Sequence, residues 1–194
     1  MARGRIRDPI RTRAVIIDAL LTALDAGEVS PTAKSIAERA GVSLRSIFVH
    51  FPDLDELKAA ATIQQTERVE LLITGADPVL PLRDRVDAVV AQTARVFTLQ
   101  RRIRVTGLVE SPSVPIIDER MRRGDRLLRD HLARTFAVEL ERPDGTVDEQ
   151  LLDLVEATTA WSFRHHLVDR CGRTPEAASD AVRRTLLGLL AGSA

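Results

Sequence analysis

The 194-residue sequence contains very little cysteine, and aromatic residues make up only 3% of it. Its one cysteine, Cys171, excludes both a disulfide framework and a zinc site built from cysteines. No apolar run approaches the roughly 18 residues that a membrane-spanning helix needs. The first 13 residues are rich in arginine and contain no apolar segment, so they do not look like a secretory signal. We therefore expect a cytoplasmic protein that has no membrane partner.

The common sequence motifs of enzymes are absent as well. No G-x-S-x-G, H-E-x-x-H or Walker sequence occurs. His165 and His166 are adjacent and would point about 100° apart on a helix, so they cannot chelate one metal ion as histidines four residues apart can. Cys171 has no histidine beside it in a nucleophile motif, and a small helical enzyme would need a cluster of titratable groups that the sequence does not show. We expect no enzymatic activity, no cofactor and no metal.

Charge is balanced over the whole chain but not along it. The formal net charge is zero. Residues 1–52 carry eight basic and five acidic side chains, and the remainder is slightly acidic. A basic N-terminal region on an acidic body is a local indication of nucleic-acid binding.

Glycine and proline cluster between segments that have the length and apolar period of helices. No segment alternates with a period of two, so the sequence predicts an all-α protein of about nine helices. The stripe Ile10, Ala14, Ile17, Leu21 and Leu24 marks the first of them. The expected helical segments are 10–26, 32–40, 43–51, 53–74, 82–111 with a break near Gly107, 116–142, 146–171 and 176–192.

Two short segments form a predicted helix–turn–helix. Thr32 is a good N-cap for the first helix, and Gly41 fits a left-handed residue after its end. Ser43 is a good N-cap for the second helix. This arrangement presents the outer face of the second helix to a DNA groove, although tight helix pairs with a glycine corner also occur in other proteins.

The residues of this motif closely resemble the TetR family of bacterial transcriptional regulators. The resemblance is carried by I-A-E-R-A-G-V-S at 36–43 and S-I-F-V-H-F-P at 46–52, within a match that covers about residues 10–60. It implies a basic arm at 1–9, a three-helix DNA-binding domain at 10–55 with the motif at 32–51, and an effector-binding and dimerisation domain at 56–194. The family often has tyrosine where Phe48 stands, so a hydroxyl bond to phosphate is lost, and Glu28 replaces a frequent aromatic residue.

The resemblance also implies a set of DNA contacts from the start of both helices and the outer face of the second. The implied residues are Thr32, Lys34, Ser43, Leu44, Arg45, Ser46, Phe48, Val49 and His50. Physically, Arg45 suits bidentate bonds to guanine, or else a phosphate, and Lys34 suits a phosphate. Leu44 and Val49 would contact thymine methyl groups or be tolerated in water. Arg3, Arg5 and Arg7 would enter a minor groove or form an attractive tail.

The body contains three apolar helical stripes that enclose either an ordinary core or an effector pocket. The TetR resemblance favours the pocket. No acidic residue lies on these stripes, so we expect a largely apolar effector, uncharged or weakly anionic. The expected pocket residues are Val89, Thr93, Phe97, Met121, Leu128, Thr158, Trp161 and His165. Residues 148–192 are expected to carry a homodimer interface that includes Leu186, Leu187 and Leu190, because the last helix is apolar nearly all round.

These features together favour a homodimeric transcriptional repressor that binds a palindromic double-stranded operator and is released by a small-molecule effector. A transcriptional activator of the same family is an alternative that the sequence does not exclude. An architectural DNA-binding protein with little base specificity is a further alternative, since the recognition helix contains one arginine.

Overall fold

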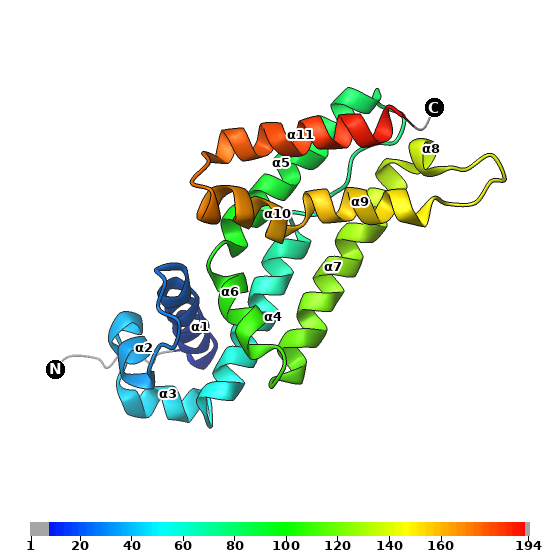
Figure 1. The fold of residues 1–194 in the computed structure, drawn as a ribbon. Helices are drawn as coiled ribbons and strands as arrows, with labels where there is room; N and C mark the ends of the chain where they lie inside the picture. The colour runs from blue at the N-terminus through cyan, green and yellow to red at the C-terminus, as the bar shows by residue number, and fades with distance from the viewer. Residues whose placement is uncertain (1–7, 193–194) are drawn as a thin grey trace. The chain divides into compact units, whose positions relative to one another are not determined.

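The computed structural model describes residues 8–192, and among them it contains helices and no strand (Figure 1). An isolated antiparallel bridge joins Glu141 and Val147. The predicted all-α class is thereby confirmed. The helices are α1 (Pro9–Asp25), α2 (Ala33–Ala40), α3 (Leu44–His50), α4 (Leu54–Glu70), α5 (Leu82–Gln100), α6 (Ile103–Glu110), α7 (Pro115–Thr135), α8 (Ala137–Leu140), α9 (Glu149–Thr159), α10 (Trp161–His165), the π-helical turn η1 (His166–Arg170) and α11 (Pro175–Leu190).

Side-chain caps fix where many of these helices begin. The Thr32 hydroxyl accepts a hydrogen bond from the Ser35 backbone N–H at 3.1 Å, and the Ser35 hydroxyl accepts one from the Thr32 N–H in return. Thr174 caps α11 in the same way, with Pro175 as the first helical residue. These caps satisfy backbone donors that would otherwise lack a partner. The predicted N-caps Thr32 and Ser43 are confirmed.

Helix breaks were predicted less well than helix starts. The break expected near Gly107 falls instead at Arg101 and Arg102, between α5 and α6. Gly107 lies inside α6, where an added Cβ would come within 3.1 Å of the Met121 sulfur. Glycine therefore permits close packing of α6 on the start of α7. The segment 146–171 is likewise interrupted, at Ala160, and the segment 116–142 at Phe136.

The chain packs as two compact units. The first comprises the residues up to Glu67 together with Arg102–Met121, and the second comprises Arg68–Arg101 together with the residues from Arg122 onward. The first unit thus contains most of α4, all of α6 and the first turns of α7 in addition to α1–α3. From the sequence we expect the boundary between the DNA-binding domain and the effector-binding domain to lie between residues 55 and 56. Packing into compact units does not test a boundary between functional domains, so it stays a prediction.

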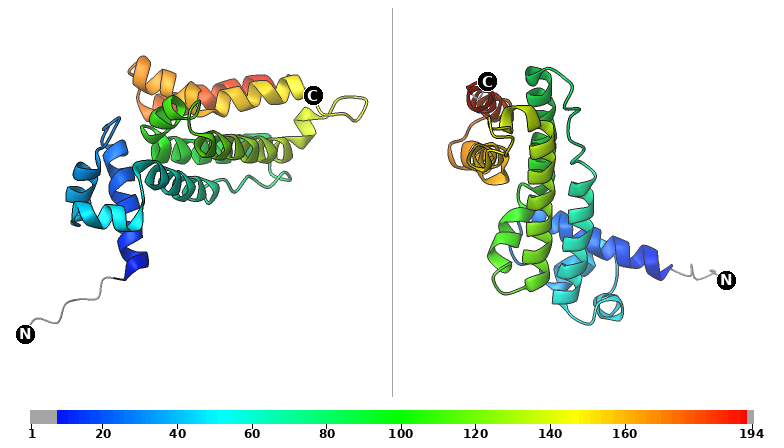
Figure 2. Two further views of the ribbon diagram at one scale, coloured as in Figure 1. Left: turned by 90° about the horizontal axis from the view of Figure 1, so that it is seen from below. Right: turned by 90° about the vertical axis from the view of Figure 1, so that its right-hand side faces the viewer.

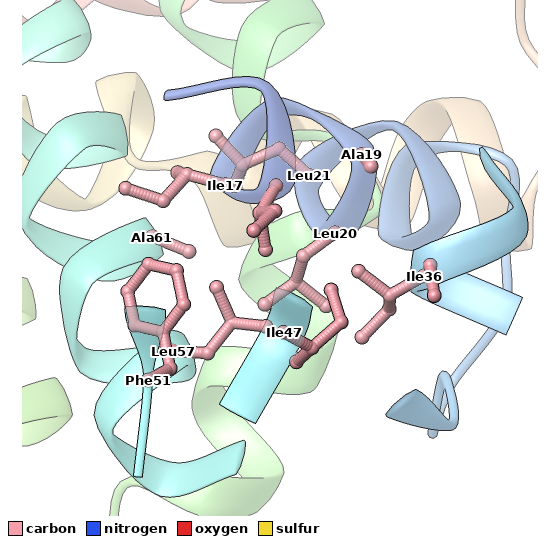
Figure 3. Packing of buried hydrophobic residues seen from close by; sticks show 11 residues of the cluster. Ile17, Ala19, Leu20, Leu21, Ile36, Ile47, Phe51, Leu57 and Ala61 are labelled. Carbon is pink, nitrogen blue, oxygen red and sulfur yellow. The ribbon is translucent and has the colours of Figure 1, made fainter. Parts of the chain in front are cut away.

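The first unit has an apolar core in which α1, α2, α3 and α4 meet. Leu20, Ile36, Ile47, Phe51 and Leu57 converge from these helices and are fully or nearly fully buried (Figure 3). The stripe predicted for α1 is correct from Ile17 onward. Its first member, Ile10, is exposed, because the N-terminal turn of α1 extends beyond the core.

The second unit has its own core, to which α5, α7, α9 and α11 contribute. Figure 2 shows α9 and α11 side by side in both views, and Figure 1 shows α11 along α5. Val86, Leu132, Phe136, Val155 and Leu186 are buried there. No helix within residues 8–192 is both long enough and apolar enough to cross a lipid bilayer.

Candidate DNA-binding site

The turn between α2 and α3 is built around one left-handed glycine. Gly41 has φ +64° and ψ +35°. The Val42 N–H donates to the Ala37 carbonyl at 3.0 Å, and the Gly41 N–H donates to the Glu38 carbonyl at 3.2 Å. This pair of bonds is the Schellman arrangement, which satisfies the last carbonyl groups of α2. The chain can then reverse within three residues and begin α3 at Leu44.

The outer face of α3 exposes apolar side chains to water. Leu44 is 46% exposed, Phe48 49% and Val49 70%, whereas Ile47 on the opposite side is completely buried. Arg45 lies on the same exposed face. Three large apolar groups beside an arginine on a helix of seven residues fit a surface that is covered when a partner binds. Thymine methyl groups and guanine edges are partners of matching chemistry in a major groove.

The two capping hydroxyls remain able to contact DNA. Thr32 and Ser43 each use an oxygen lone pair to accept a backbone N–H bond, at 3.1 Å in both cases. These bonds do not use their O–H protons, and a phosphate oxygen at a helix N-terminus is a suitable acceptor for an O–H donor. Lys34 is exposed on the first turn of α2, Ser46 is half-buried, and the side chain of His50 is half-buried at the end of α3.

Arg13 is a residue that the sequence reasoning missed. Its Nη1 donates a 2.7 Å hydrogen bond to the His50 carbonyl, and its guanidinium lies 4.1 Å above the centre of the Phe51 ring. Its Nη2 is 3.9 Å from Glu56 on α4. Arg13 therefore links α1 to the last carbonyls of α3. The bonded residues are 37 positions apart, so no local pattern could have revealed the contact.

The structure gives Glu28 a role in the same unit. Glu28, which follows α1, pairs with Arg39 in the last turn of α2. An ion pair thus stands at a position where the family that the sequence resembles often has an aromatic residue. Arg3, Arg5 and Arg7 lie outside the described residues, and their expected contact with a minor groove stays a prediction.

The structure brings together only part of the expected effector pocket. The Trp161 ring stacks on His165, with centroids 4.3 Å apart, and lies 6.4 Å from the Phe97 ring. Thr93 and Thr158 are buried, and their hydroxyls donate to backbone carbonyls one turn earlier. Of the other expected pocket residues, Val89 and Leu128 pack in or against the core of the second unit, and Met121 belongs to the first unit.

The structure also changes which residues we expect at the dimer interface. Leu186 and Leu190 are buried inside the core of their own protomer, and Leu187 packs partly against it. The side chains of Leu186 and Leu190 are therefore not available to a partner subunit. The apolar character of α11 on several sides reflects packing against α5 and α9 instead. A dimer interface within residues 148–192 remains an expectation for the exposed faces of these helices.

The histidines and the cysteine near η1 also have defined surroundings. Cys171 Sγ lies 3.4 Å from His166 Nε2, a neighbour that the sequence reasoning did not foresee. His165 Nδ1 lies 2.9 Å from Asp169, whose carboxylate also accepts bonds from Arg101. The Arg101 guanidinium holds the pKa of Asp169 below its usual value. No group of three metal-ligating side chains occurs in the part of the chain that the structure describes.

Solved structures with similar folds identify the architecture. A transcriptional regulator from Rhodococcus matches over 96% of this chain and 97% of its own, with a TM-score of 0.70 and 19% sequence identity. A protein assigned to the TetR family from Mesorhizobium loti matches over 97% and 98%, with a TM-score of 0.65 and 15% identity. The chain has the TetR-family fold.

A third neighbour, SmeT in complex with triclosan, matches over 92% of this chain and 90% of its own, with a TM-score of 0.60 and 18% identity. No protein-family model matches the sequence, and no curated protein matches it. At these identities the comparisons establish the TetR fold. They agree with the resemblance that the helix–turn–helix residues carry.

Proposed function

We propose that this protein is a DNA-binding transcriptional regulator of the TetR family, which binds a palindromic operator as a homodimer and releases it when a small-molecule effector binds. The observation that carries the proposal is the exposed face of α3, where Arg45 lies among Leu44, Phe48 and Val49. The fold supports it, since the structural neighbours are described as transcriptional regulators. Two-fold symmetry would place two such helices about one DNA turn, roughly 34 Å, apart.

Effector control is supported by the fold and by one neighbour. SmeT, which shares the fold, was solved as a complex with triclosan. An effector can change operator occupancy only through different affinities for two shapes of the dimer. Repression is the simplest outcome of operator binding, because a bound dimer blocks access to the promoter.

Selection of binding sites from random DNA duplexes tests the proposal. At about 150 mM salt, the wild-type protein should enrich one sequence with two inverted half-sites whose centres lie about ten base pairs apart. Arg45→Ala should relax the preference at one base pair of each half-site. Arg126→Ala, which removes the same charge from the exposed surface of α7, serves as the control and should leave the enriched sequence unchanged. Strongly salt-dependent binding with no enriched sequence would instead favour the architectural alternative.

A further inference from the structure

Arg164 on α10 carries a guanidinium that is buried without a counter-ion. The residue is 2% exposed. Its Nη2 donates to the Val90 carbonyl at 2.9 Å and to Thr93 Oγ1 at 3.1 Å, and its Nη1 donates to Ser179 Oγ at 3.0 Å. All three acceptors are neutral. No carboxylate within residues 8–192 pairs with Arg164, and burial lowers its pKa to about 10.

The other fully enclosed arginine of the same unit shows the contrast. Arg85 on α5 is also buried, but it forms two short bonds to the Glu139 carboxylate, at 2.6 and 2.7 Å. A buried cation ordinarily requires such a partner, because taking an unpaired charge out of water costs several kcal/mol. Two carboxylates on the elements around Arg164 pair with other arginines: Asp169 of η1 with Arg101, and Asp87 of α5 with Arg183.

Two buried N–H groups of α10 also lack acceptors. They are Arg164 Nε and Trp161 Nε1. Residues three positions apart lie on the same side of a helix, about 5–6 Å apart at Cβ. Both side chains face α5, where Arg164 bonds Thr93 and Trp161 lies beside Phe97, one turn further along. A buried donor without an acceptor is unfavourable, and one acceptor group placed between the two N–H groups would satisfy both.

Aromatic and apolar side chains surround these two N–H groups. Trp161 stacks nearly parallel on His165, at an interplanar angle of 13°, and Phe97 is tilted beside it. Val168 and Ala178 bury the neighbouring surface. Trp161 and His165 are only half-buried, so the aromatic pair lies nearer to solvent than Arg164 does.

We propose that Arg164 and Trp161 bind the carboxylate of a small organic acid whose flat apolar body packs against Phe97 and the Trp161–His165 pair. The carboxylate oxygens accept the unpaired Nε–H of Arg164 and the indole N–H, and their charge neutralises the guanidinium. The inference deepens the proposed function by naming the class of effector. It narrows the expectation of a largely apolar effector, uncharged or weakly anionic, to a monocarboxylate, because the cluster has one positive charge to neutralise.

Paired probes that differ only in charge test this assignment. Benzoate, phenylacetate, 3-phenylpropionate and octanoate would each be titrated against the full-length wild-type protein beside the corresponding neutral primary amide. Trp161 is the only tryptophan, so its emission reports the site directly. At least one acid should change that emission saturably and raise Tm, whereas its amide should have no effect over the same concentrations. If no acid binds more tightly than its amide by either measurement, the assignment is wrong.

Variants then locate the binding of the preferred acid. Arg164→Gln should weaken it by at least about tenfold, since a hydrogen bond to a charged group is lost. Arg183→Gln removes the same charge from α11 outside the cluster and should bind like wild type. If Arg164→Gln does not fold, Trp161→Phe keeps an aromatic ring at this position but removes the indole N–H together with part of the ring system, and it should weaken binding several-fold by thermal shift. Unchanged affinity in the folded variant would overturn the proposal.

The DNA selection and the acid titration test different proposals, so a negative result in one does not refute the other. A protein that enriches a palindromic site but prefers no acid over its amide would retain the proposed function and lose this inference. A protein that binds an acid through Arg164 but enriches no DNA sequence would lose the proposed function instead.

Discussion

Arg45, Arg85 and Arg164 carry the same cationic group in three different surroundings. Arg45 is exposed on α3 beside apolar side chains, Arg85 is buried against Glu139, and Arg164 is buried against neutral oxygens. Because burial makes an unpaired charge unfavourable, the free energy of each arginine depends on the partner it finds. Arg85 is paired within the protein, whereas we propose that Arg45 contacts DNA and that Arg164 binds an anion.

Substitution of Arg45 should change which DNA sequences bind. Arg45→Ala should lower operator affinity by about 1–3 kcal/mol and leave binding to random DNA nearly unchanged, because a bidentate bond to guanine is specific. Lys34→Ala should weaken operator and random DNA alike, because a phosphate contact carries no sequence information. Fluorescence anisotropy with both DNAs measures the two ratios. An unchanged operator-to-random ratio for Arg45→Ala would show that Arg45 does not read a base.

Replacing Gly41 by alanine should destabilise the helix–turn–helix. An added Cβ meets no atom within 4 Å, so the penalty comes only from the left-handed φ of +64°. Gly41→Ala should lower the free energy of unfolding by about 1–2 kcal/mol. Gly124→Ala is the matched control: it lies inside α7, also has open space, and should raise stability by about 0.5–1 kcal/mol. Urea denaturation followed by circular dichroism measures both, and equal effects would contradict the backbone explanation.

The Arg85–Glu139 pair should make stability depend on acid pH. The hydrogen bond from Arg85 lowers the pKa of Glu139 below its ordinary value of 4.5. The stabilisation is therefore complete above about pH 4.5, where the unfolded carboxyl is also ionised, and it is lost as the pH falls through the lower folded pKa. Glu139→Gln should cost about 3 kcal/mol at pH 7, because it leaves Arg85 buried and unpaired.

Denaturation at a series of pH values between 7 and 3 checks this sign. The stability difference between wild type and Glu139→Gln should shrink as the pH drops below 4.5. Glu141→Gln, at an exposed position two residues away, should follow wild type throughout. A difference that stays constant down to pH 3 would mean that ionisation of Glu139 is not the cause.

At the scale of helices, the local sequence determines where a helix begins but does not determine where it is interrupted. Each N-cap hydroxyl accepts a hydrogen bond from the backbone N–H three residues later, so the sequence alone predicts the helix starts at Thr32, Ser43 and Thr174. The break between α5 and α6 was misplaced at Gly107, because that glycine serves a contact with Met121 that the sequence does not display. The N-terminal helix–turn–helix was therefore predictable in detail and the body only in outline.

The same distinction explains which site residues were missed. Arg13 meets His50 across 37 positions, and Arg164 meets Val90 across 74. Contacts between residues so far apart depend on how the helices pack. The DNA-facing residues, in contrast, lie within one short motif whose spacing is fixed by the turn at Gly41.

Arg13 should affect stability and operator binding because it holds the C-terminal end of α3 in place, and not only because it is positively charged. Arg13→Met keeps the aliphatic length but loses the bond to the His50 carbonyl and the contact with Phe51, so α3 should fray at its C-terminal end. We expect a loss of about 1–2 kcal/mol in stability and weaker operator binding. Faster amide hydrogen exchange at His50 and Phe51 would report the fraying directly.

Arg11→Met separates this explanation from simple attraction to DNA. Arg11 is exposed on the same helix, so its loss removes an equal charge and leaves α3 untouched. Amide exchange at the end of α3 should then stay at the wild-type rate. If both variants weaken operator binding equally and neither changes the exchange rates, Arg13 acts only as a charge.

At the scale of the whole molecule, agreement with the TetR fold extends far beyond the residues that first indicated it. The resemblance in sequence covers about residues 10–60, whereas the structural match covers nearly the whole chain. Whole-chain identities of 19% and 15% to these neighbours are compatible with a shared fold, because a core tolerates many apolar substitutions of similar volume. In the proposal above, the buried guanidinium of Arg164 is the polar group that selects the effector.

The dimer prediction depends on separating surface from core within residues 148–192. Among the described residues of this region, Leu154 on α9 is a large apolar side chain that is 52% exposed, and Leu186 is fully buried. Leu154→Glu should place a charge in the subunit interface and give monomers with native helix content, which would occupy single half-sites weakly. Leu186→Glu should instead lose helix content, since it buries an unpaired carboxylate. Sedimentation equilibrium and circular dichroism distinguish the two results. A Leu154→Glu protein that remains dimeric would move the interface away from α9, and a wild-type protein that sediments as a monomer at micromolar concentration would refute paired half-site binding.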